Sequence, residues 1–395
     1  MKILVVCQHY WPEPYPLRDV CEELVARGHQ VDLITGVPNY PQGYIYPEYR
    51  NGKNRIQVHN GVRIHRTFTI GRRNNVVFRF LNYFSFAISS TVCAHRMKDE
   101  FDVIFTNQTS PVMMSCGALA YGKKHHKKVV LYCMDLWPAS LAVGGIRENS
   151  LIYRIFHWIS GRIYRSADRI LITSELFRDY LCREFGVAED VVAYHPQYTE
   201  LTFRQKTLPV KDTVDLMFAG NVGAAQCIPT ILRAAEILKD QPRLRWHIVG
   251  DGSKLEENQK MAGKMGLSNV VFHGRKPQEE MPEYYAMADA MLVTLTADPL
   301  ISMTLPGKVQ TYMAAGKPII GAANGEIPRT IEKSRCGFCA PAENAEELAR
   351  IISEIAADDA LRKKYGENAR RYYQEHFQKE QFFDALEDVL KRNCI

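Results

Sequence analysis

Short apolar segments alternate with amphipathic segments along the chain, and this alternation predicts an α/β fold built on parallel sheets. The chain opens with an apolar segment at residues 2–7. A loop at 8–16 and an amphipathic helix at 17–27 follow, and Gly28 is a common residue at the end of a helix. Further strands of this half are expected at residues 30–35, 102–106, 128–133, 168–173 and 191–194.

The same alternation restarts beyond residue 214. Strands are expected at residues 215–220, 245–249, 270–272, 290–294 and 318–322. Helices are expected at residues 228–239, 254–265, 280–287, 307–314 and 345–356, with a long helical tail from residue 358. The polar stretch at 199–212 interrupts the pattern, and we interpret it as a linker.

The pattern therefore predicts two Rossmann-like domains that face each other across a cleft. A chain of 395 residues also exceeds what one hydrophobic core usually serves. We place the first domain at 1–200 and the second at 210–375. A C-terminal helix at 376–395 is expected to pack back on the first domain. Open α/β sheets bind ligands at the carboxyl ends of their strands, so the cleft is the expected site.

The net charge of the chain adds little to the prediction of fold and site. The chain has 50 basic and 44 acidic residues, a net charge of +6. This mild excess is compatible with anionic ligands or an anionic membrane, and equally with an ordinary protein surface. No dense basic segment is present, so no nucleic-acid partner is expected.

The ten cysteines are scattered, many of them inside apolar segments, which favours free thiols in a reducing compartment. Cys336 and Cys339 have CxxC spacing, but no second pair of ligands stands nearby, so no zinc site is expected. From the sequence we expect no signal peptide and no apolar stretch near the roughly 20 residues that span a bilayer. We expect a cytoplasmic protein, soluble or peripheral to the membrane.

The loops after the strands exclude two common nucleotide sites. The first loop, residues 7–12, has no glycine and so lacks the dinucleotide-binding G-x-G-x-x-G, and no P-loop motif occurs in the chain. A phosphate can still be bound by backbone N–H groups at a helix N-terminus. Two segments have this character, 220–223 after a strand and 302–308 at the start of a helix. Lys308 adds a cation in the first turn of that helix, unless it is a surface lysine beside a turn.

Several segments together resemble glycosyltransferase family 4, a family of retaining sugar transferases with the two-domain GT-B fold. The segment 308–318 with Gly325 and Glu326 resembles its C-terminal signature, and 218–223 and 249–252 resemble its glycine-rich strand ends. The segments at 28–31, 39–41 and 135–138 resemble the branch that acts in bacterial surface polysaccharide biosynthesis. The resemblance covers nearly the whole chain.

The sequence departs from the family at charged and glycine positions. Residues 13–18 replace its Gly-Gly pair, and Met134 stands where many members have histidine. Asn221 and Gln226 occupy the positions of an Arg and a Lys that bind the donor diphosphate, and Met303 and Thr311 those of its paired glutamates. Two interpretations follow: Arg18 and Lys308 replace the missing cations, which we favour, or the site has degenerated.

The resemblance implies a donor site in the second domain and an acceptor site in the first. Expulsion of the nucleotide diphosphate needs stabilised charge, for which Lys308 and Arg18 are the candidate cations. Asp135 would hold the acceptor hydroxyl or support the sugar cation, unless it caps the helix ahead of Pro138. Glu326 would contact sugar hydroxyls or, alternatively, stabilise the structure of the loop that contains it. The other expected donor-binding residues are Gly220, Asn221, Gly223, Gln226, Gly250, Arg275, Lys276, Thr304, Leu305, Gly307 and Thr311. The expected acceptor-binding residues are Tyr10, Trp11, Asn39, Tyr40 and Trp137.

By this resemblance the protein transfers a sugar from a nucleotide diphosphate sugar, UDP-linked in many members, to a glycan or polyprenyl-diphosphate-linked acceptor. No metal or other cofactor is expected. Basic and aromatic residues mix at 71–86 and 153–158, which suits contact with the inner membrane surface or, alternatively, core-facing helices with solvated arginines. A sugar-nucleotide epimerase of the same fold and a catalytically degenerate sugar-nucleotide-binding module are the alternatives.

Overall fold

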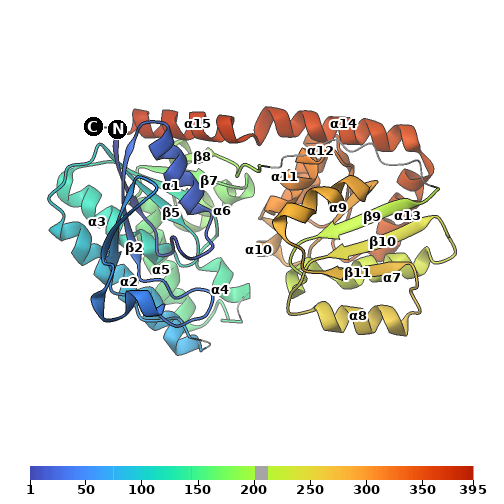
Figure 1. The fold of residues 1–395 in the computed structure, drawn as a ribbon, viewed down its shortest axis with the longest axis horizontal. Helices are drawn as coiled ribbons and strands as arrows, with labels where there is room; N and C mark the ends of the chain where they lie inside the picture. The colour runs from blue at the N-terminus through green and yellow to red at the C-terminus, as the bar shows by residue number, and fades with distance from the viewer. Residues whose placement is uncertain (74, 144, 201–211, 395) are drawn as a thin grey trace. The chain divides into compact units, whose positions relative to one another are not determined.

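The computed structural model describes residues 1–73, 75–143, 145–200 and 212–394, and it divides into two compact units (Figure 1). Unit 1 comprises Met1–His195 together with Phe383–Ile395, and unit 2 comprises Pro196–Phe382. The division after His195 precedes the predicted linker, most of which (201–211) lies outside the described residues. Both units are α/β with parallel sheets, as the apolar segments predict.

Unit 1 contains an eight-stranded sheet in the order β3-β4-β2-β1-β5-β6-β7-β8. All neighbours pair in parallel except β3 and β4. The inner strands are buried on both faces, which explains why they read as continuous apolar segments. The strands are β1 (Lys2–Val6), β2 (Gln30–Gly36), β3 (Ile56–His59), β4 (Val62–Thr67), β5 (Val103–Gln108), β6 (Val129–Cys133), β7 (Arg169–Ile172) and β8 (Val192–Tyr194).

The β3–β4 hairpin is absent from the sequence-based prediction. It is an edge hairpin with one face open, so its residues alternate in burial and form no continuous apolar segment. Its two-residue turn is Asn60-Gly61, and both residues have positive φ, 46° and 81°. An Asn-Gly pair between short strands is a strong hairpin signal, so the sequence did contain the information.

Helices flank the sheet of unit 1. They are α1 (Leu17–Ala26), α2 (Val76–Arg96), α3 (Cys116–His125), α4 (Ala139–Val143), α5 (Leu151–Arg165), α6 (Leu176–Phe185) and most of α15 (Lys379–Arg392), with 3₁₀ turns η1 (Pro47–Gly52), η2 (Val112–Ser115) and η3 (Glu189–Val191). The C-terminal part of α15 packs on unit 1. There Asp384 accepts a 2.7 Å hydrogen bond from Arg27, and Phe383, Leu386 and Leu390 are fully buried.

Helix α2 corrects one expectation. Among the described residues it is the one helix long and apolar enough to cross a membrane, by length and composition only. We had expected no apolar stretch near that length. Within its most apolar window 28% of the residues are buried, because one side of the helix packs on the domain.

Unit 2 contains a six-stranded parallel sheet in the order β11-β10-β9-β12-β13-β14. The strands are β9 (Val214–Ala219), β10 (Leu244–Val249), β11 (Val270–Gly274), β12 (Ala290–Thr294), β13 (Ile319–Ala322) and β14 (Gly337–Ala340). The helices are α7 (Ile228–Ile237), α8 (Leu255–Lys264), α9 (Met281–Met287), α10 (Pro299–Ser302), α11 (Gly307–Ala314), α12 (Glu326–Ser334), α13 (Ala345–Ala357) and α14 (Asp359–His376), with 3₁₀ turns η4 (Ala224–Gln226) and η5 (Gln278–Glu280).

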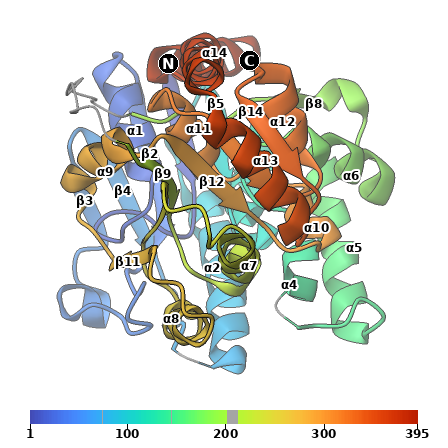
Figure 2. The same cartoon turned by 90° about the vertical axis from the view of Figure 1, so that its right-hand side faces the viewer.

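Two hydrophobic cores sandwich this sheet. Helices α7, α8 and α13 cover one face, and α9, α11, α12 and α14 cover the other (Figure 2). The prediction found most of these elements but not α10, α12 or β14. Cys336 is buried just before β14 and Cys339 lies on it, three residues away. Both cysteines pack on the same hydrophobic core, and the described residues contain no group of three side chains that could hold a metal ion.

Candidate functional site

The strand ends of β9 and β10 in unit 2 pack closely through glycines. Gly220 follows β9 with φ 144°, a conformation that side chains disfavour. A Cβ on Gly250 would lie 1.8 Å from the carbonyl oxygen of Gly220. The backbone N–H of Gly220 donates to the carbonyl of Val249 over 2.9 Å. The two glycines predicted as donor-binding residues therefore bring two strand ends into backbone contact.

The loop after Gly220 is held by neutral side chains. Gln226 Oε1 accepts hydrogen bonds from Asn221 Nδ2 and from the backbone N–H of Gly223, both at 3.1 Å. Asn221 is exposed and Gln226 is partly exposed. These are the positions where the family has cations, so here an amide pair shapes the loop and supplies no positive charge.

Helix α11 is tied to the end of β9 by Tyr312. The buried Tyr312 hydroxyl donates to the carbonyl of Ala219 over 2.8 Å and accepts from the N–H of the same residue over 2.9 Å. Lys308 lies one turn earlier on α11, and residues four apart share one side of a helix. The lysine therefore points toward the same strand end, where a Cβ on Gly220 would lie 2.9 Å from its Nζ.

The Lys308 amine is buried and has no hydrogen-bond partner among the described residues. Its Nζ lies 3.9 Å from the centroid of the Phe218 ring, which is a favourable cation–π distance. The stem of the side chain is partly exposed, whereas the amine itself is enclosed. Burial lowers the pKa of Lys308 from 10.5 to about 7. A buried amine without a counter-ion is costly, so an anion bound beside it would be strongly favoured.

The residues around the start of α11 form the rest of this cluster. Pro306 precedes the helix, and no side chain caps its N-terminus, which leaves its first N–H groups without a side-chain acceptor. Thr311 Oγ1 donates to the carbonyl of Gly307 over 3.2 Å and lies 3.3 Å from Thr199 Oγ1. Thr304 is partly exposed and Leu305 is buried. An uncapped N-terminus beside a buried amine suits a phosphate group.

The remaining predicted donor residues lie at other strand ends of unit 2. Glu326 is buried in the first turn of α12. The preceding Gly325 packs against α10, since a Cβ there would lie 2.1 Å from the carbonyl oxygen of Ser302. Arg275 is exposed after β11, and Lys276 Nζ lies 5.5 Å from the Tyr284 ring centroid. All follow parallel strands and so share the carboxyl edge of one sheet.

In unit 1 the loop after β1 is organised by a glutamate that the sequence analysis did not single out. The buried Glu13 Oε1 accepts the backbone N–H groups of Asn39 and Tyr40, both at 2.7 Å. Its Oε2 lies 2.9 Å from Nδ1 of the buried His9, and the His9 ring stacks on Tyr15 at 4.7 Å. A lone glutamate between two prolines was the available signal. Its two backbone partners, Asn39 and Tyr40, are more than 25 residues away, and nothing in the local sequence indicates them.

Asp135 follows β6 and is surrounded by hydroxyl groups. Ser110 Oγ donates to its carboxylate, and Ser140 Oγ lies 3.1 Å from Ser110 Oγ. Burial raises the pKa of Asp135, and the hydroxyls of Ser110 and Ser140 oppose that shift. The Ser110 contact comes from the loop after β5, so the carboxylate links the ends of β5 and β6.

Arg18 lies on the exposed side of α1. Its guanidinium is 3.1 Å from Asp19 and 4.0 Å from Glu22, and its side chain is 49% exposed. It is therefore an accessible cation that already has two carboxylate neighbours.

The predicted acceptor residues divide into enclosed and accessible side chains. Tyr10 and Trp137 are buried, and Trp137 packs edge-on against Phe156 at 5.7 Å. Asn39 is also buried. Trp11, stacked on His59 at 3.9 Å, and Tyr40 are partly exposed. In this structure only the last two offer side-chain surface to a ligand.

Sequence comparison matches both parts of the chain to glycosyltransferases. Residues 17–196 match the profile described as Glycosyltransferase Family 4, and residues 200–372 match Glycosyl transferases group 1. WbjE of Pseudomonas aeruginosa, named as a glycosyltransferase, is 27% identical over 248 residues, which are 59% of this chain and 60% of that protein. WcaI of Escherichia coli K12, named as a colanic acid biosynthesis glycosyl transferase, is 25% identical over 96% of this chain and 97% of its own length.

Solved structures show the same fold. Sucrose-phosphate synthase of Thermosynechococcus elongatus superposes with a TM-score of 0.75 at 20% identity, over 99% of this chain and 98% of that one. HepE of Anabaena, in complex with UDP, superposes with a TM-score of 0.73 at 16% identity, over 99% and 100%. The fold class expected from the sequence is confirmed. The chain belongs to the glycosyltransferases of the GT-B fold, with a family 4 N-terminal part and a group 1 C-terminal part, and it is related to enzymes of surface polysaccharide biosynthesis.

Proposed function

We propose that this glycosyltransferase moves a sugar, with retention of configuration, from a UDP-sugar to a glycan or polyprenyl-diphosphate-linked acceptor in surface polysaccharide assembly. The observation that carries the proposal is the buried Lys308 amine, which has no hydrogen-bond partner among the described residues. It lies beside Gly220 and near the N-terminus of α11, which no side chain caps. HepE, which shares the fold, has been solved with UDP and with UDP-glucose.

In this proposal the Lys308 amine and the N-terminus of α11 bind the donor diphosphate. As the bond to the sugar breaks, negative charge grows on the phosphate oxygens, and a cation already fixed in place stabilises it without reorganisation. The proposed mechanism uses no metal ion or other cofactor. Asn221 and Gln226 would position the loop, and Thr311 and Glu326 would contact the sugar nucleotide.

Unit 1 supplies the acceptor side of the proposed reaction. Asp135 would hold the acceptor hydroxyl or support the sugar cation, and Arg18 would add a second, accessible cation for phosphate. Trp11 and Tyr40 are the partly exposed aromatic residues that we assign to the acceptor. A lipid-linked acceptor would place the enzyme in the cytoplasm, at the inner face of the membrane.

A binding experiment tests the donor site. Titration calorimetry with UDP should give an affinity that Lys308→Ala lowers about 100-fold, because a charge-assisted contact in a dry site is lost. Lys254→Ala, which removes an exposed lysine paired with Glu257, should leave the affinity unchanged. Equal affinities for the wild type and Lys308→Ala would disprove the site.

Turnover separates the transferase from the two alternatives. Incubation with a UDP-sugar alone should release little UDP, and addition of the acceptor should release it in step with glycan growth. An epimerised sugar nucleotide formed without acceptor would indicate the epimerase instead. Tight UDP binding with no turnover for any acceptor tried would indicate the degenerate module. Arg18→Ala should slow turnover if the arginine acts on the donor phosphate, and unchanged turnover would remove Arg18 from the proposed site.

A further inference from the structure

The exposed side of α2 is apolar over most of its length, up to the polar last turn with His95 and Arg96. Residues spaced by three or four along a helix share one side, and five residues on this side of α2 are apolar and exposed. They are Val77, Leu81, Phe84, Ile88 and Val92. Ile88 is 65% exposed, which is unusual for isoleucine in a domain that has a large core.

Helix α5 extends this surface. Phe156 of α5 stacks on Phe80 of α2 at 5.4 Å and on Phe84 at 6.0 Å, so the two helices are packed side by side. Next to these contacts α5 exposes four more apolar residues: Leu151, Ile152, Ile155 and Trp158. We call these nine exposed residues of α2 and α5 the apolar strip. Contiguous exposed apolar surface of this kind marks an interaction site.

The charged side chains that α2 and α5 themselves carry are mostly arginines. Neither helix contains an aspartate or a glutamate. Their arginines are Arg79, Arg96, Arg154, Arg162 and Arg165. The Arg162 guanidinium lies 4.9 Å from the Trp158 ring centroid. A neighbouring carboxylate, Glu184 of α6, lies 3.6 Å from His157 Nε2 of α5. Two helices that expose apolar residues and carry arginines but no carboxylates of their own complement an anionic lipid surface.

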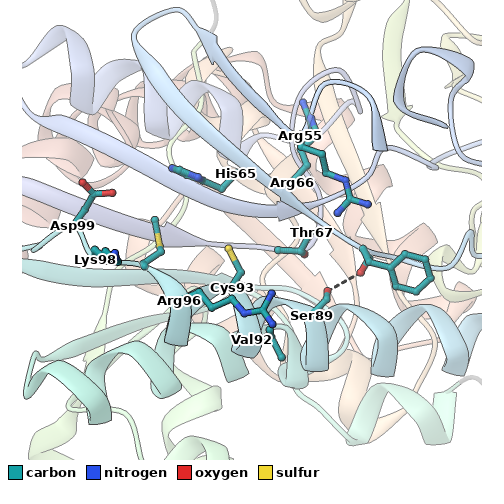
Figure 3. A pocket seen from close by; sticks show the side chains of 12 residues that line it. Arg55, His65, Arg66, Thr67, Ser89, Val92, Cys93, Arg96, Lys98 and Asp99 are labelled. Atoms are coloured by element: carbon teal, nitrogen blue, oxygen red, sulfur yellow. Dashed lines mark hydrogen bonds between the residues drawn. The ribbon is translucent and has the colours of Figure 1, made fainter. Parts of the chain in front are cut away.

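A cavity of about 610 Å³ flanks the C-terminal part of α2 (Figure 3). Residues of β4 line one wall of the cavity and residues of α2 the other, with Val92 of the strip at its rim. Arg55, Arg96 and Lys98 also line it, and none of these three forms an ion pair with any residue that the structure describes. The one lining carboxylate, Asp99, lies 3.4 Å from Arg63 Nη2. The cavity therefore offers unpaired positive charge beside exposed apolar side chains.

Helix α2 is fixed to its domain and lies against it. Its buried Asn82 accepts a 2.6 Å hydrogen bond from Gln8 and donates one of 2.6 Å to the carbonyl of Ile70. A Cβ on Gly117 of α3 would lie 2.9 Å from the Cβ of Ser90, so these two helices are closely packed. Insertion of α2 across a bilayer would break these contacts, whereas a helix lying along the surface keeps them.

We propose that unit 1 docks on an anionic phospholipid bilayer through the apolar strip, and that the cavity between β4 and α2 binds a lipid phosphate. The strip enters the boundary between headgroups and acyl chains, and Arg55, Arg96 and Lys98 bind the phosphate beside it. The inference deepens the proposed function, because it names the surface through which the transferase would reach a lipid-linked acceptor.

Vesicle co-sedimentation tests the docking. The full chain should sediment with vesicles of phosphatidylcholine mixed with phosphatidylglycerol, far less with phosphatidylcholine alone, and less at high salt. Ile88→Ser should weaken binding by about tenfold, because a buried apolar side chain is lost from the lipid interface. Ile237→Ser, on α7 of unit 2, removes an isoleucine of 50% exposure and serves as the matched control.

A double variant tests the phosphate site. Arg96→Gln with Lys98→Gln should weaken binding about 25-fold, since each basic residue near the surface contributes about fivefold. Lys260→Gln with Lys264→Gln removes two exposed charges from α8 and should have no effect. Circular dichroism and melting curves check that each variant is folded.

Three results would overturn the inference. The first is equal sedimentation of the wild type and the strip and cavity variants. The second is equal binding to neutral vesicles. The third is a dimer in solution that Ile88→Ser dissociates, since a second copy would then cover the strip. UDP affinity measured on the same variants should not change, so a failure here is distinguishable from a failure of the proposed donor site.

Discussion

The loops that follow the first strand of each unit differ in what fills them. After β9 in unit 2, glycines leave the strand end without side chains. The Lys308 amine beside it is enclosed and has no hydrogen-bond partner among the described residues. After β1 in unit 1, His9, Tyr10 and Glu13 fill the loop, and the Glu13 carboxylate is bound to two backbone N–H groups and a histidine.

The difference teaches how to tell a binding loop from a structural one. In unit 2 the buried group without a hydrogen-bond partner among the described residues is the Lys308 amine, so an anion beside the loop would be favoured. In unit 1 the buried Glu13 carboxylate already has its hydrogen-bond partners, and the proposed ligand contacts are the partly exposed Trp11 and Tyr40. Substitutions that perturb the two loops separately test this difference between them.

The largest effect is expected at the glycine contact of unit 2. Gly250→Ala places a Cβ 1.8 Å from the Gly220 carbonyl oxygen, so the loop must move. UDP binding should be lost, and the free energy of unfolding should fall by about 3 kcal/mol or more. Gly263→Ala, in α8, is the control because nothing lies within 4 Å of its Cβ. If Gly250→Ala binds UDP like the wild type in calorimetry, the glycines do not shape the site.

Lys308→Met should change binding and stability in opposite directions. The folded-state pKa of about 7 lies below the usual 10.5, so the unfolded chain binds more protons between these values. The wild type is therefore penalised at neutral pH and gains stability as pH rises toward 10.5. The variant should unfold at a higher temperature, and its free energy of unfolding should rise by about 2–4 kcal/mol, while its affinity for UDP falls about 100-fold. A variant that loses both stability and affinity would show that the lysine is structural.

The pH dependence of UDP binding should reveal the same amine. Bound diphosphate raises the pKa of Lys308, so binding above pH 7 takes up one proton. Affinity should then fall about tenfold per pH unit above the free-state pKa. Calorimetry in two buffers of different ionisation enthalpy measures this proton uptake directly. The slope should vanish in Lys308→Met, and a wild-type affinity that stays constant from pH 7 to pH 9 would contradict the assignment.

The smallest effect on donor binding is expected from unit 1. Glu13→Ala leaves two backbone N–H groups and His9 without their acceptor, at a cost of about 3 kcal/mol in unfolding free energy. UDP affinity should change by less than about twofold, because we propose the donor site in unit 2. Glu48→Ala, at an exposed residue of η1, is the matched control for stability. A large loss of UDP affinity in Glu13→Ala would show that the two loops are coupled.

Sequence patterns predicted the sheets better than the loops. Strands β9, β10 and β12 consist mainly of apolar residues and are bounded by glycine or polar residues, so their positions could be predicted closely. The β3–β4 hairpin was missed because an edge hairpin alternates in burial. Lys308 could be chosen as a candidate, but its burial depends on Phe218 and Tyr312, which only the folded chain brings to it. The Glu13 network could not be foreseen, since backbone N–H groups leave no mark in sequence.

Helix α15 has a consequence for synthesis on the ribosome. Phe383, Leu386 and Leu390 complete the core of unit 1. Arg27 of the same unit donates a hydrogen bond to Asp384, which is synthesised near the end of the chain. Because domains fold from the N-terminus as the chain emerges, unit 2 can acquire all its residues before unit 1 does. The first unit to be translated is thus the last to be finished. The apolar surface of unit 1 that α15 covers stays exposed while the chain from Pro196 to Phe382 is synthesised, and cells that lack holdase chaperones should accumulate aggregates of the nascent protein.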